Sequence, residues 1–501
     1  EYRRQRQMCI RDRDHTSKAL SQALKEAEQS FYNPSYIVNE GEILKQQEQF
    51  KNTHLPQEGD EKDYIARLYK LLPGITQISS PCFIGHMTAR LPGFMPKIAH
   101  LVTALNQNVL KTETSAVLTL QEKEVIAKMH RQFYGFSDDF YRRYTQDATG
   151  SLGFFTSGGT LSNLNALYIA LNQSASVEGN RLKYWYRQGV EEVAVIGSES
   201  MHYSFDKACN VLGLKLLKCP VGKDFSIDIA ALEPLFKEAE KKHYKVIALI
   251  GTAGSTDCGA IDDLLQLSKI AQEKNIHFHV DGAWGGAFIL SEHYKERLKG
   301  IENADTITMD GHKQLLLPMG SGMLFFKTPT LVQDSAHFAP YAVRKESKDL
   351  GRFTLEGSRA ANGLYLEAAL MLMGQKGISA YLEASVKRAE YFAHQIQNST
   401  DFQLITWPQL NMVLYRYVPS FLKREDLDPT YLNRLNTALQ QKQKERGKTF
   451  VSRTERPLVK KGRAETLLRA VLLNPISEYE DLDAVLADQR QIGEELIDQG
   501  L

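Results

Sequence analysis

The sequence predicts an α/β protein with a large, mostly parallel sheet and a smaller α+β domain toward the C-terminus. In the central part of the chain, short apolar runs rich in β-forming residues alternate with amphipathic stretches of helical period. Strands that alternate with helices in this way are typical of βαβ units and therefore of a parallel sheet. The expected strands are residues 190–197, 244–252, 276–281, 305–309 and 322–327, with helices over 229–241 and 262–274. Ligands of such sheets bind beyond the carboxyl ends of the strands, so the residues that follow each strand are the candidates for a site.

The flanking regions are predicted from the spacing of apolar side chains and from clusters of Pro and Gly. The pattern indicates helices over residues 17–28, 64–72, 101–110, 120–133 and 380–397, a loop-rich segment over 81–96, and strands over 412–417 and 467–473. We therefore expect an N-terminal helical segment over residues 14–100, a large domain over 101–374 and a small α+β domain over 375–501.

Residues 1–13, EYRRQRQMCIRDR, contain five Arg and two acidic residues. They lack the apolar core that a secretory signal needs. We interpret this segment as a non-native addition.

The composition excludes several classes of protein. With 43% hydrophobic and 24% charged residues, the 501-residue chain resembles neither a disordered nor a collagen-like protein. The 61 basic and 60 acidic residues leave a net charge of +1, which does not indicate a nucleic-acid partner. No apolar run approaches the roughly 18 residues of a membrane helix, and the five scattered cysteines form no disulfide or zinc pattern. We expect a cytoplasmic, reduced protein with no metal, no nucleic-acid partner and no membrane partner.

Lys313 is the most informative position, because it follows an expected strand in the sequence DGHKQLLL. Desolvation of an ammonium group is costly and lowers its pKa. A lysine among apolar neighbours is therefore either paired or used as a neutral amine, which can form a Schiff base. A buried stem whose charged head reaches solvent is the structural alternative.

Three other strand ends carry residues of matching chemistry. Asp281 ends an expected strand and could face a planar ring, or it could cap a helix. The turn Ser157-Gly158-Gly159-Thr160 precedes a helical stretch and could bind an anion through backbone N–H groups, although many such turns bind nothing. His202 follows another strand and could stack on a ring or be structural. A phosphate cradle, an imidazole, a carboxylate and a lysine together are what pyridoxal 5′-phosphate requires.

With these residues in place, the chain resembles the group II pyridoxal-phosphate-dependent decarboxylases, which include glutamate and aromatic amino-acid decarboxylases. The resemblance covers nearly the whole chain from about residue 14 and is carried by FFTSGGTLSN (154–163), ESMHYS (199–204), HVDGAWGG (279–286), DGHK (310–313) and LEGSR (355–359). Three further segments are similar to the bacterial pyridoxal-dependent aspartate 1-decarboxylases: FIGHMTARLPGFM (83–95), SKDLGRFTLEGSR (347–359) and GKTFVSRT (447–454). Two positions depart from the family pattern. The family usually has Ala at the position of Gly282, and Ala or Pro at the position of Gly311.

The resemblance implies the fold-type I architecture of the aspartate aminotransferase-like enzymes and a role for each matching residue. Lys313 would hold the cofactor covalently, Asp281 would pair with the ring nitrogen, and His202 and Ala283 would pack on the two faces of the ring. The residues implied around the phosphate are Ser157, Gly158, Gly159 and His312. Tyr341 is implied as the proton donor to the product, and the substrate-binding residues are implied to be His86, Thr88 and Arg469. A homodimer with active sites between the subunits is also implied.

The expected reaction is α-decarboxylation of an acidic L-amino acid, with L-aspartate giving β-alanine and CO₂. L-Glutamate giving γ-aminobutyrate is the close alternative, and tyrosine or 2,4-diaminobutyrate is a further one. An aminotransferase or sulfur lyase would share the fold and the Lys–Asp pair, and a catalytically inactive relative would share the fold. The context of His202 and the DGHK sequence favour a decarboxylase over an aminotransferase or a lyase, and an inactive relative would not need to retain every cofactor group.

Overall fold

The computed structural model describes residues 17–338, 347–421, 428–458 and 462–501. The chain divides into a larger unit, residues 91–393 and 404–414, and a second unit, residues 1–90, 394–403 and 415–501. This division differs from the expected boundaries after residues 100 and 374, because the N-terminal segment groups with the C-terminal part of the chain. Helix α14 (Gly363–Gln397) also extends past residue 374, where Gly374 interrupts it with φ 67° and ψ 166°.

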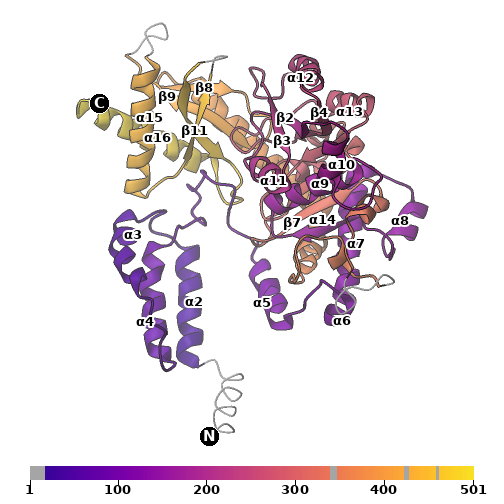
Figure 1. The fold of residues 1–501 in the computed structure, drawn as a ribbon. Coiled ribbons are helices and arrows are strands. Elements are labelled where there is room, and N and C mark those ends of the chain that lie inside the picture. The colour runs from indigo at the N-terminus through magenta and orange to yellow at the C-terminus, as the bar shows by residue number, and fades with distance from the viewer. Residues whose placement is uncertain (1–16, 339–346, 422–427, 459–461) are drawn as a thin grey trace. The chain divides into compact units, whose positions relative to one another are not determined.

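The larger unit is built on a seven-stranded sheet of order β1-β7-β6-β5-β4-β2-β3, of which Figure 1 labels β2, β3, β4 and β7. Strand β7 is antiparallel to both of its neighbours, and the other pairings are parallel. The strands are β1 (Gly153–Thr156), β2 (Glu192–Ser198), β3 (Lys215–Cys219), β4 (Tyr244–Thr252), β5 (His277–Asp281), β6 (Thr306–Asp310) and β7 (Gly322–Phe326). All residues of β1, β5, β6 and β7 are buried, as expected for a sheet covered on both faces.

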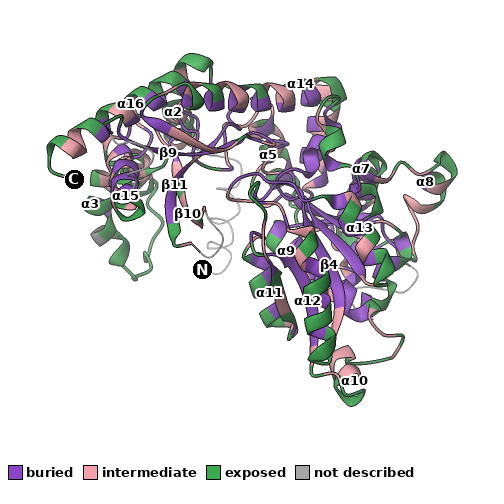
Figure 2. Ribbon diagram, turned by 90° about the horizontal axis from the view of Figure 1, so that it is seen from above, coloured by how far each residue is buried: buried purple, intermediate pink, exposed green. Residues whose placement is uncertain are grey.

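Helices make up most of the rest of the larger unit. They are α5 (Met95–Leu105), α6 (Thr112–Ser115), α7 (Val117–Tyr134), α8 (Asp138–Tyr144), α9 (Gly159–Gln173), α10 (Arg181–Arg187), α11 (Ser204–Leu212), α12 (Ile229–Lys241), α13 (Leu264–Glu273) and most of α14. Helix α9 lies across the sheet, because Leu167 and Ala170 pack with residues of β2 and β4 while Ala166 and Ile169 pack with residues of β1 and β7. Figure 2 shows β4 buried and the outer side of α12 exposed.

The register of the sheet aligns five strand ends along one edge. Gly322 pairs with both Thr156 and Asp310, so the ends of β1 and β6 lie on either side of the start of β7. Asp281 pairs with Thr252 on one side and with Thr308 on the other. The carboxyl ends of β1, β4, β5 and β6 therefore present their side chains and the loops that follow to a common region.

The second unit contains α2 (Lys18–Tyr32), α3 (Glu40–Gln47), α4 (Glu61–Leu71), α15 (Pro429–Arg446) and α16 (Tyr479–Asp498). Strands β10 (Ser452–Pro457) and β11 (Ala464–Val471) belong to this unit and to a four-stranded sheet of order β10-β11-β9-β8. The other two strands of that sheet, β8 (Phe402–Thr406) and β9 (Met412–Tyr417), each include residues of both units. Helices α2 and α4 lie side by side (Figure 1), and the Tyr69 hydroxyl donates to Glu26 between them. The carboxylates of Asp60 and Asp428 accept backbone N–H groups at the starts of α4 and α15, which fixes where these helices begin.

Three predicted elements agree with the structure at both ends. Helix α12, strand β4 and strand β9 have the predicted bounds. The predicted helix over 101–110 is wrong in position, because α5 begins at Met95 and ends at Leu105, where Asn106 takes the left-handed conformation with φ 45°. Strand β10, SRTERP, carries too few apolar residues to be recognised from sequence.

Candidate active site

A cavity of about 510 Å³ opens at the aligned strand ends of the larger unit. All eight residues expected to contact the cofactor line it: Ser157, Gly158, Gly159, His202, Asp281, Ala283, His312 and Lys313. They are spread over more than 150 positions of the chain, and the sheet register brings them together. The prediction that the site lies beyond the carboxyl ends of the strands agrees with this location.

The turn between β1 and α9 forms one wall of the cavity. The first-turn N–H groups of α9 have no acceptor within the helix, which makes this end suitable for an anion. Gly159 is required here by close packing, since a Cβ at this position would lie 2.9 Å from Asp310 Oδ2 and 3.2 Å from the Ala283 Cβ. The first helical turn therefore rests directly on the ends of β5 and β6.

The backbone N–H of Ser157 is already used within the chain. It donates to the Glu356 carboxylate, at 3.1 Å to Oε1 and 3.3 Å to Oε2. A phosphate that uses this N–H must displace Glu356. Glu356, from the LEGSR segment, therefore competes with a phosphate for the Ser157 N–H. The SGGT turn alone did not indicate this contact.

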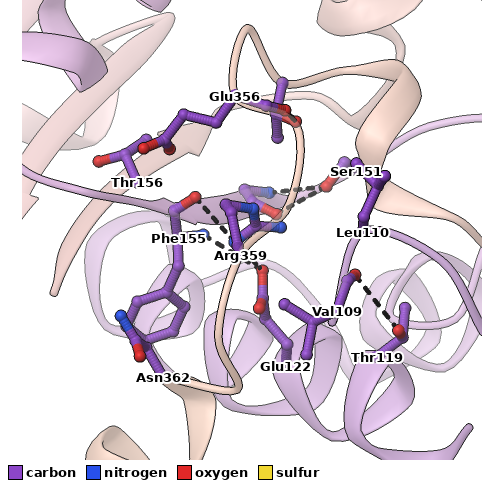
Figure 3. Close-up of polar contacts among 12 residues, drawn as sticks. Val109, Leu110, Thr119, Glu122, Ser151, Phe155, Thr156, Glu356, Arg359 and Asn362 are labelled. Carbon is purple, nitrogen blue, oxygen red and sulfur yellow. Dashed lines mark hydrogen bonds and ion pairs between the residues drawn. The ribbon is translucent and has the colours of Figure 1, made fainter. Parts of the chain in front are cut away.

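Behind the cradle, Arg359 holds the end of β1 (Figure 3). Its guanidinium donates to Phe155 O and to Glu122 Oε1, both at 2.9 Å, and Phe155 N–H donates to the same Glu122 oxygen at 3.3 Å. Both charged side chains are almost fully removed from solvent, at 7% and 0% exposure. This cluster ties β1 to α7 two residues before the cradle.

Asp281 ends β5 and is 5% exposed. Its Oδ1 accepts the Ala283 N–H at 3.1 Å, and its Oδ2 accepts the Asn163 amide at 3.1 Å. Burial raises the pKa of Asp281, whereas Lys313 and these donors favour the ionised form. The carboxylate therefore has a strong preference for a cationic partner at the cavity. Gly282 allows β5 to approach β6, because a Cβ there would lie 2.9 Å from Thr308 O.

Lys313 lies in the turn after β6, with its side chain 17% exposed. Its Nζ lies 3.0 Å from Asp310 Oδ2, and His312 Nε2 lies 3.7 Å from the same oxygen. Its amino group is therefore held by Asp310 at the wall of the cavity that both residues line. Asp310, which the sequence indicated only as part of the DGHK motif, also belongs to the site, because it lines the cavity and pairs with Lys313.

His202 lines the cavity just before α11, and its Nδ1 accepts the Ser204 N–H at 3.3 Å. The role of Nδ1 as an acceptor places the proton of a neutral ring on Nε2. Burial lowers the pKa of His202 and also that of His312. This environment therefore favours the neutral form of both rings.

The donor and acceptor groups of the cavity fit pyridoxal phosphate. Among the described residues, Thr252 Oγ1 and His312 Nδ1 are buried polar atoms without a hydrogen-bond partner, and both residues line the cavity. A ligand with phosphate and hydroxyl oxygens would satisfy them, and a buried carboxylate suits a ring nitrogen. Two further residues of the cavity, Thr252 and Asn163, were not predicted from the sequence. Thr252 ends a predicted strand, which is the signal that could have identified it, and Asn163 lies four residues after Gly159 on α9.

The expected substrate residues lie in the second unit. His86 Nδ1 and Thr88 Oγ1 are 3.1 Å apart, and Arg469 on β11 donates from Nε to Ser452 Oγ at 2.9 Å. The segment containing His86 packs on the same sheet, since Val471 N–H donates to Ile84 O. Tyr341 lies outside the described residues.

Known proteins are similar to this chain in sequence and in fold. The family model for the pyridoxal-dependent decarboxylase conserved domain matches residues 45–418. Aspartate 1-decarboxylase of Aliivibrio fischeri is 37% identical, over 95% of this chain and 90% of that protein. Aromatic-L-amino-acid decarboxylase of Bacillus atrophaeus is 26% identical, over 69% of each chain. The crystal structure of Oryza sativa TDC with PLP and tryptamine has a TM-score of 0.83 at 19% identity, covering 97% of this chain and 98% of that one.

The fold and site define a pyridoxal-phosphate enzyme of fold-type I. The chain belongs to the pyridoxal-dependent decarboxylase family and is a carboxy-lyase that acts on an amino acid with pyridoxal 5′-phosphate as cofactor. The predicted fold class, cofactor and reaction class are confirmed. In the part of the chain that the structure describes, no helix has both the length and the apolar character needed to span a membrane.

Proposed function

We propose that the protein decarboxylates L-aspartate to β-alanine and CO₂. The observation that carries this proposal is the similarity to an aspartate 1-decarboxylase, which extends over nearly the full length of both chains. L-Glutamate, giving γ-aminobutyrate, is the second candidate. It differs from aspartate by one methylene group, and pockets discriminate such a difference by only about 1–3 kcal/mol.

In the proposed mechanism, Lys313 would hold the cofactor covalently through its Nζ, at the position where the substrate would bind with its amino group. Bound pyridoxal phosphate supplies a protonated ring that accepts the electron pair released when CO₂ leaves Cα. Asp281 holds the proton of the ring nitrogen, since a buried anion favours the cationic form of its partner. His202 and Ala283 confine the ring from its two faces, while Gly158, Gly159 and His312 bind the phosphate.

Two groups are candidates for proton delivery to Cα. Tyr341 is the proposed donor, and His202 is the alternative because it lines the cavity. We further propose that Arg469 binds the distal carboxylate of the substrate through its guanidinium, which is suited to paired carboxylate contacts. His86 and Thr88 are proposed to contact the substrate from the N-terminal segment.

We also propose that the enzyme is a cytoplasmic homodimer with active sites between subunits. In this proposal residues 1–13 are non-native, 14–100 pack on the partner subunit, 101–374 hold the cofactor, and 375–501 form the small domain. Exposed apolar side chains on residues 17–90 support a covered surface there, for example Leu44 at 68% and Leu55 at 89% exposure.

The substrate is tested by incubating the holoenzyme with each of the twenty amino acids and measuring the released CO₂ and amine. Aspartate should be consumed with the highest kcat/KM, with one β-alanine formed per CO₂. Preferential turnover of glutamate would show that glutamate, and not aspartate, is the substrate. Preferential turnover of tyrosine or a diamino acid would contradict an acidic substrate, and keto acid formation without CO₂ would contradict decarboxylation itself.

A further inference from the structure

Behind Asp281 lies a buried chain of hydrogen bonds that the decarboxylase reaction as described above does not use. Asp281 Oδ2 accepts from Asn163 Nδ2 at 3.1 Å, and Asn163 Oδ1 lies 3.1 Å from His279 Nε2. His279 Nδ1 in turn lies 2.8 Å from Thr306 Oγ1. Asn163 is 1% exposed, and His279 and Thr306 are fully buried.

The topology of the sheet explains why these groups meet. His279 and Asp281 are two residues apart on β5, so their side chains point to the same face. His279 pairs with Thr306 on the neighbouring strand β6, and Asn163 reaches the pair from α9, the helix that covers this part of the sheet. Ser204 Oγ also accepts from Asn163 Nδ2, at 3.0 Å, which anchors the amide on its remaining side.

The direction of every hydrogen bond in the chain follows from the charge of Asp281. An ionised carboxylate only accepts, so Asn163 must turn its NH₂ group to Asp281 and its oxygen to His279. That oxygen also only accepts, so His279 Nε2 carries the proton. Burial lowers the pKa of His279 to about 3, so the ring is neutral and its Nδ1 is unprotonated.

The contacts of Thr306 fit this assignment, which also requires Gln173 to turn its amide NH₂, and not the Oε1 that lies 3.3 Å away, toward His277 Nδ1. The unprotonated Nδ1 of His279 accepts the hydroxyl proton of Thr306. With its proton used in this way, Thr306 Oγ1 can accept from His277 Nε2, which lies 2.8 Å away. The N–H and O–H groups of this series of hydrogen bonds therefore all donate in the same direction. The last donor is the amide of Asn163, which donates to the Asp281 carboxylate.

We propose that Asn163 and His279 are positioning residues that orient the Asp281 carboxylate and favour its ionised form, so that it keeps the cofactor ring nitrogen protonated. This inference rests on the proposed role of Asp281. His279 acts through Asn163, since its Nε2–H fixes which end of the amide faces the carboxylate. Neither residue needs to touch the reacting atoms.

The first test requires no substitution. In ¹⁵N-histidine-labelled holoenzyme, His279 should appear as a neutral Nε2–H tautomer that does not titrate between about pH 5 and pH 8. The resonance is assigned by its loss in His279→Gln. An Nδ1–H tautomer or a protonated ring would overturn the inference, because the amide of Asn163 would then have to face the other way.

The second test measures the ring nitrogen directly. Holoenzyme is reconstituted with cofactor labelled with ¹⁵N in the ring, and the chemical shift reports the fraction of protonated nitrogen. Asn163→Leu should move the shift toward the unprotonated form and weaken cofactor binding by about tenfold or more, because the buried carboxylate of Asp281 loses a hydrogen bond. His279→Leu should move the shift in the same direction, because the donor that orients the Asn163 amide is lost. His279→Gln should retain most of the wild-type shift, since its amide can donate to Asn163.

Asn172→Leu is the matched control on α9. Asn172 is also buried, but its amide donates to Tyr168 O and does not contact Asp281. It should leave the ring shift unchanged while reporting the general cost of replacing a buried asparagine in the melting temperature. A wild-type shift in folded Asn163→Leu, beside a changed shift in Asp281→Asn, would overturn this inference alone. A wild-type shift in Asp281→Asn would overturn the proposed role of Asp281 itself.

Discussion

Arg359 and Glu122 form an ion pair of 2.9 Å at a place where neither side chain has appreciable access to water. The pair is joined to the backbone of Phe155 through both its carbonyl and its N–H. Phe155 lies two residues before Ser157 and three before Gly158. The ion pair therefore holds the backbone that leads into the proposed phosphate-binding turn.

Removal of one partner of this pair should destabilise the larger unit severely. Arg359→Met or Glu122→Gln leaves an uncompensated buried group, so we expect a loss of about 3–5 kcal/mol in the free energy of unfolding. Urea denaturation checks this. Arg142→Met, which breaks an exposed ion pair with Asp139, is the control and should leave the midpoint unchanged. Equal midpoints for Arg359→Met and Arg142→Met would show that the buried pair does not support the fold.

Lys313→Ala should abolish turnover and the covalent attachment of cofactor. Borohydride reduction followed by peptide mass spectrometry should find the cofactor on Lys313 in the wild type and on no lysine in the variant. Lys327→Ala, at the end of the neighbouring strand β7, should keep both activity and attachment. Cofactor fixed to a different lysine in the wild type would refute the assignment of Lys313.

Glu356→Gln should tighten cofactor binding. The carboxylate occupies the Ser157 N–H and repels a phosphate, whereas a neutral amide competes more weakly for the same donor. We expect the dissociation constant for pyridoxal phosphate, measured by fluorescence titration of the apoenzyme, to fall about threefold or more. Glu199→Gln, whose carboxylate accepts the Val221 N–H away from the cavity, should leave the constant unchanged. Weaker binding in Glu356→Gln would indicate that Glu356 supports the cradle.

Because of Lys123, the free energy of unfolding should be larger at alkaline pH than at neutral pH. Burial lowers its pKa to about 8 in the folded chain, while its Nζ donates to Asp147 O at 2.7 Å. Between about pH 8 and pH 10 the unfolded chain, in which a lysine titrates near 10.4, binds more protons than the folded one, so the free energy of unfolding rises with pH. The full gain is on the order of 3 kcal/mol.

Lys123→Met should lose this alkaline gain, because the apolar side chain has no proton to release. Urea midpoints at several pH values, compared with those of the wild type, isolate the contribution. Lys128→Met, on the exposed side of the same helix, should follow the wild-type pH profile. A parallel profile for Lys123→Met would mean that this lysine does not titrate differently on folding.

Arg469→Ala should raise KM for aspartate by about tenfold or more, since a charge-assisted hydrogen bond to the distal carboxylate is lost. The kcat at saturating substrate should change less, because the side chain does not take part in proton transfer. Arg453→Ala, on the adjacent strand β10 and hydrogen bonded to Gln440, is the matched control. An unchanged KM in Arg469→Ala would remove this arginine from the substrate site.

The sequence by itself determined the fold class and eight residues of the cavity. Alternation of apolar strands with amphipathic helices is a local pattern, and β4, β9 and α12 were predicted with the observed bounds for this reason. The rule that parallel strands present ligand-binding residues at their carboxyl ends then identified Asp281 and Lys313 before any contact was known. The same rule also predicts Thr252, which ends β4 and lines the cavity.

Only the tertiary structure decided which groups satisfy one another. Glu356 reaches the N–H of Ser157 across 199 positions of the chain, and no spacing in the sequence indicates that pairing. Asn163 and His279 support Asp281 because α9 happens to cover β5 at that point. The physical reason is that hydrogen bonds and desolvation act over a few ångströms in space, whereas sequence patterns report only the local backbone and the side that a residue faces.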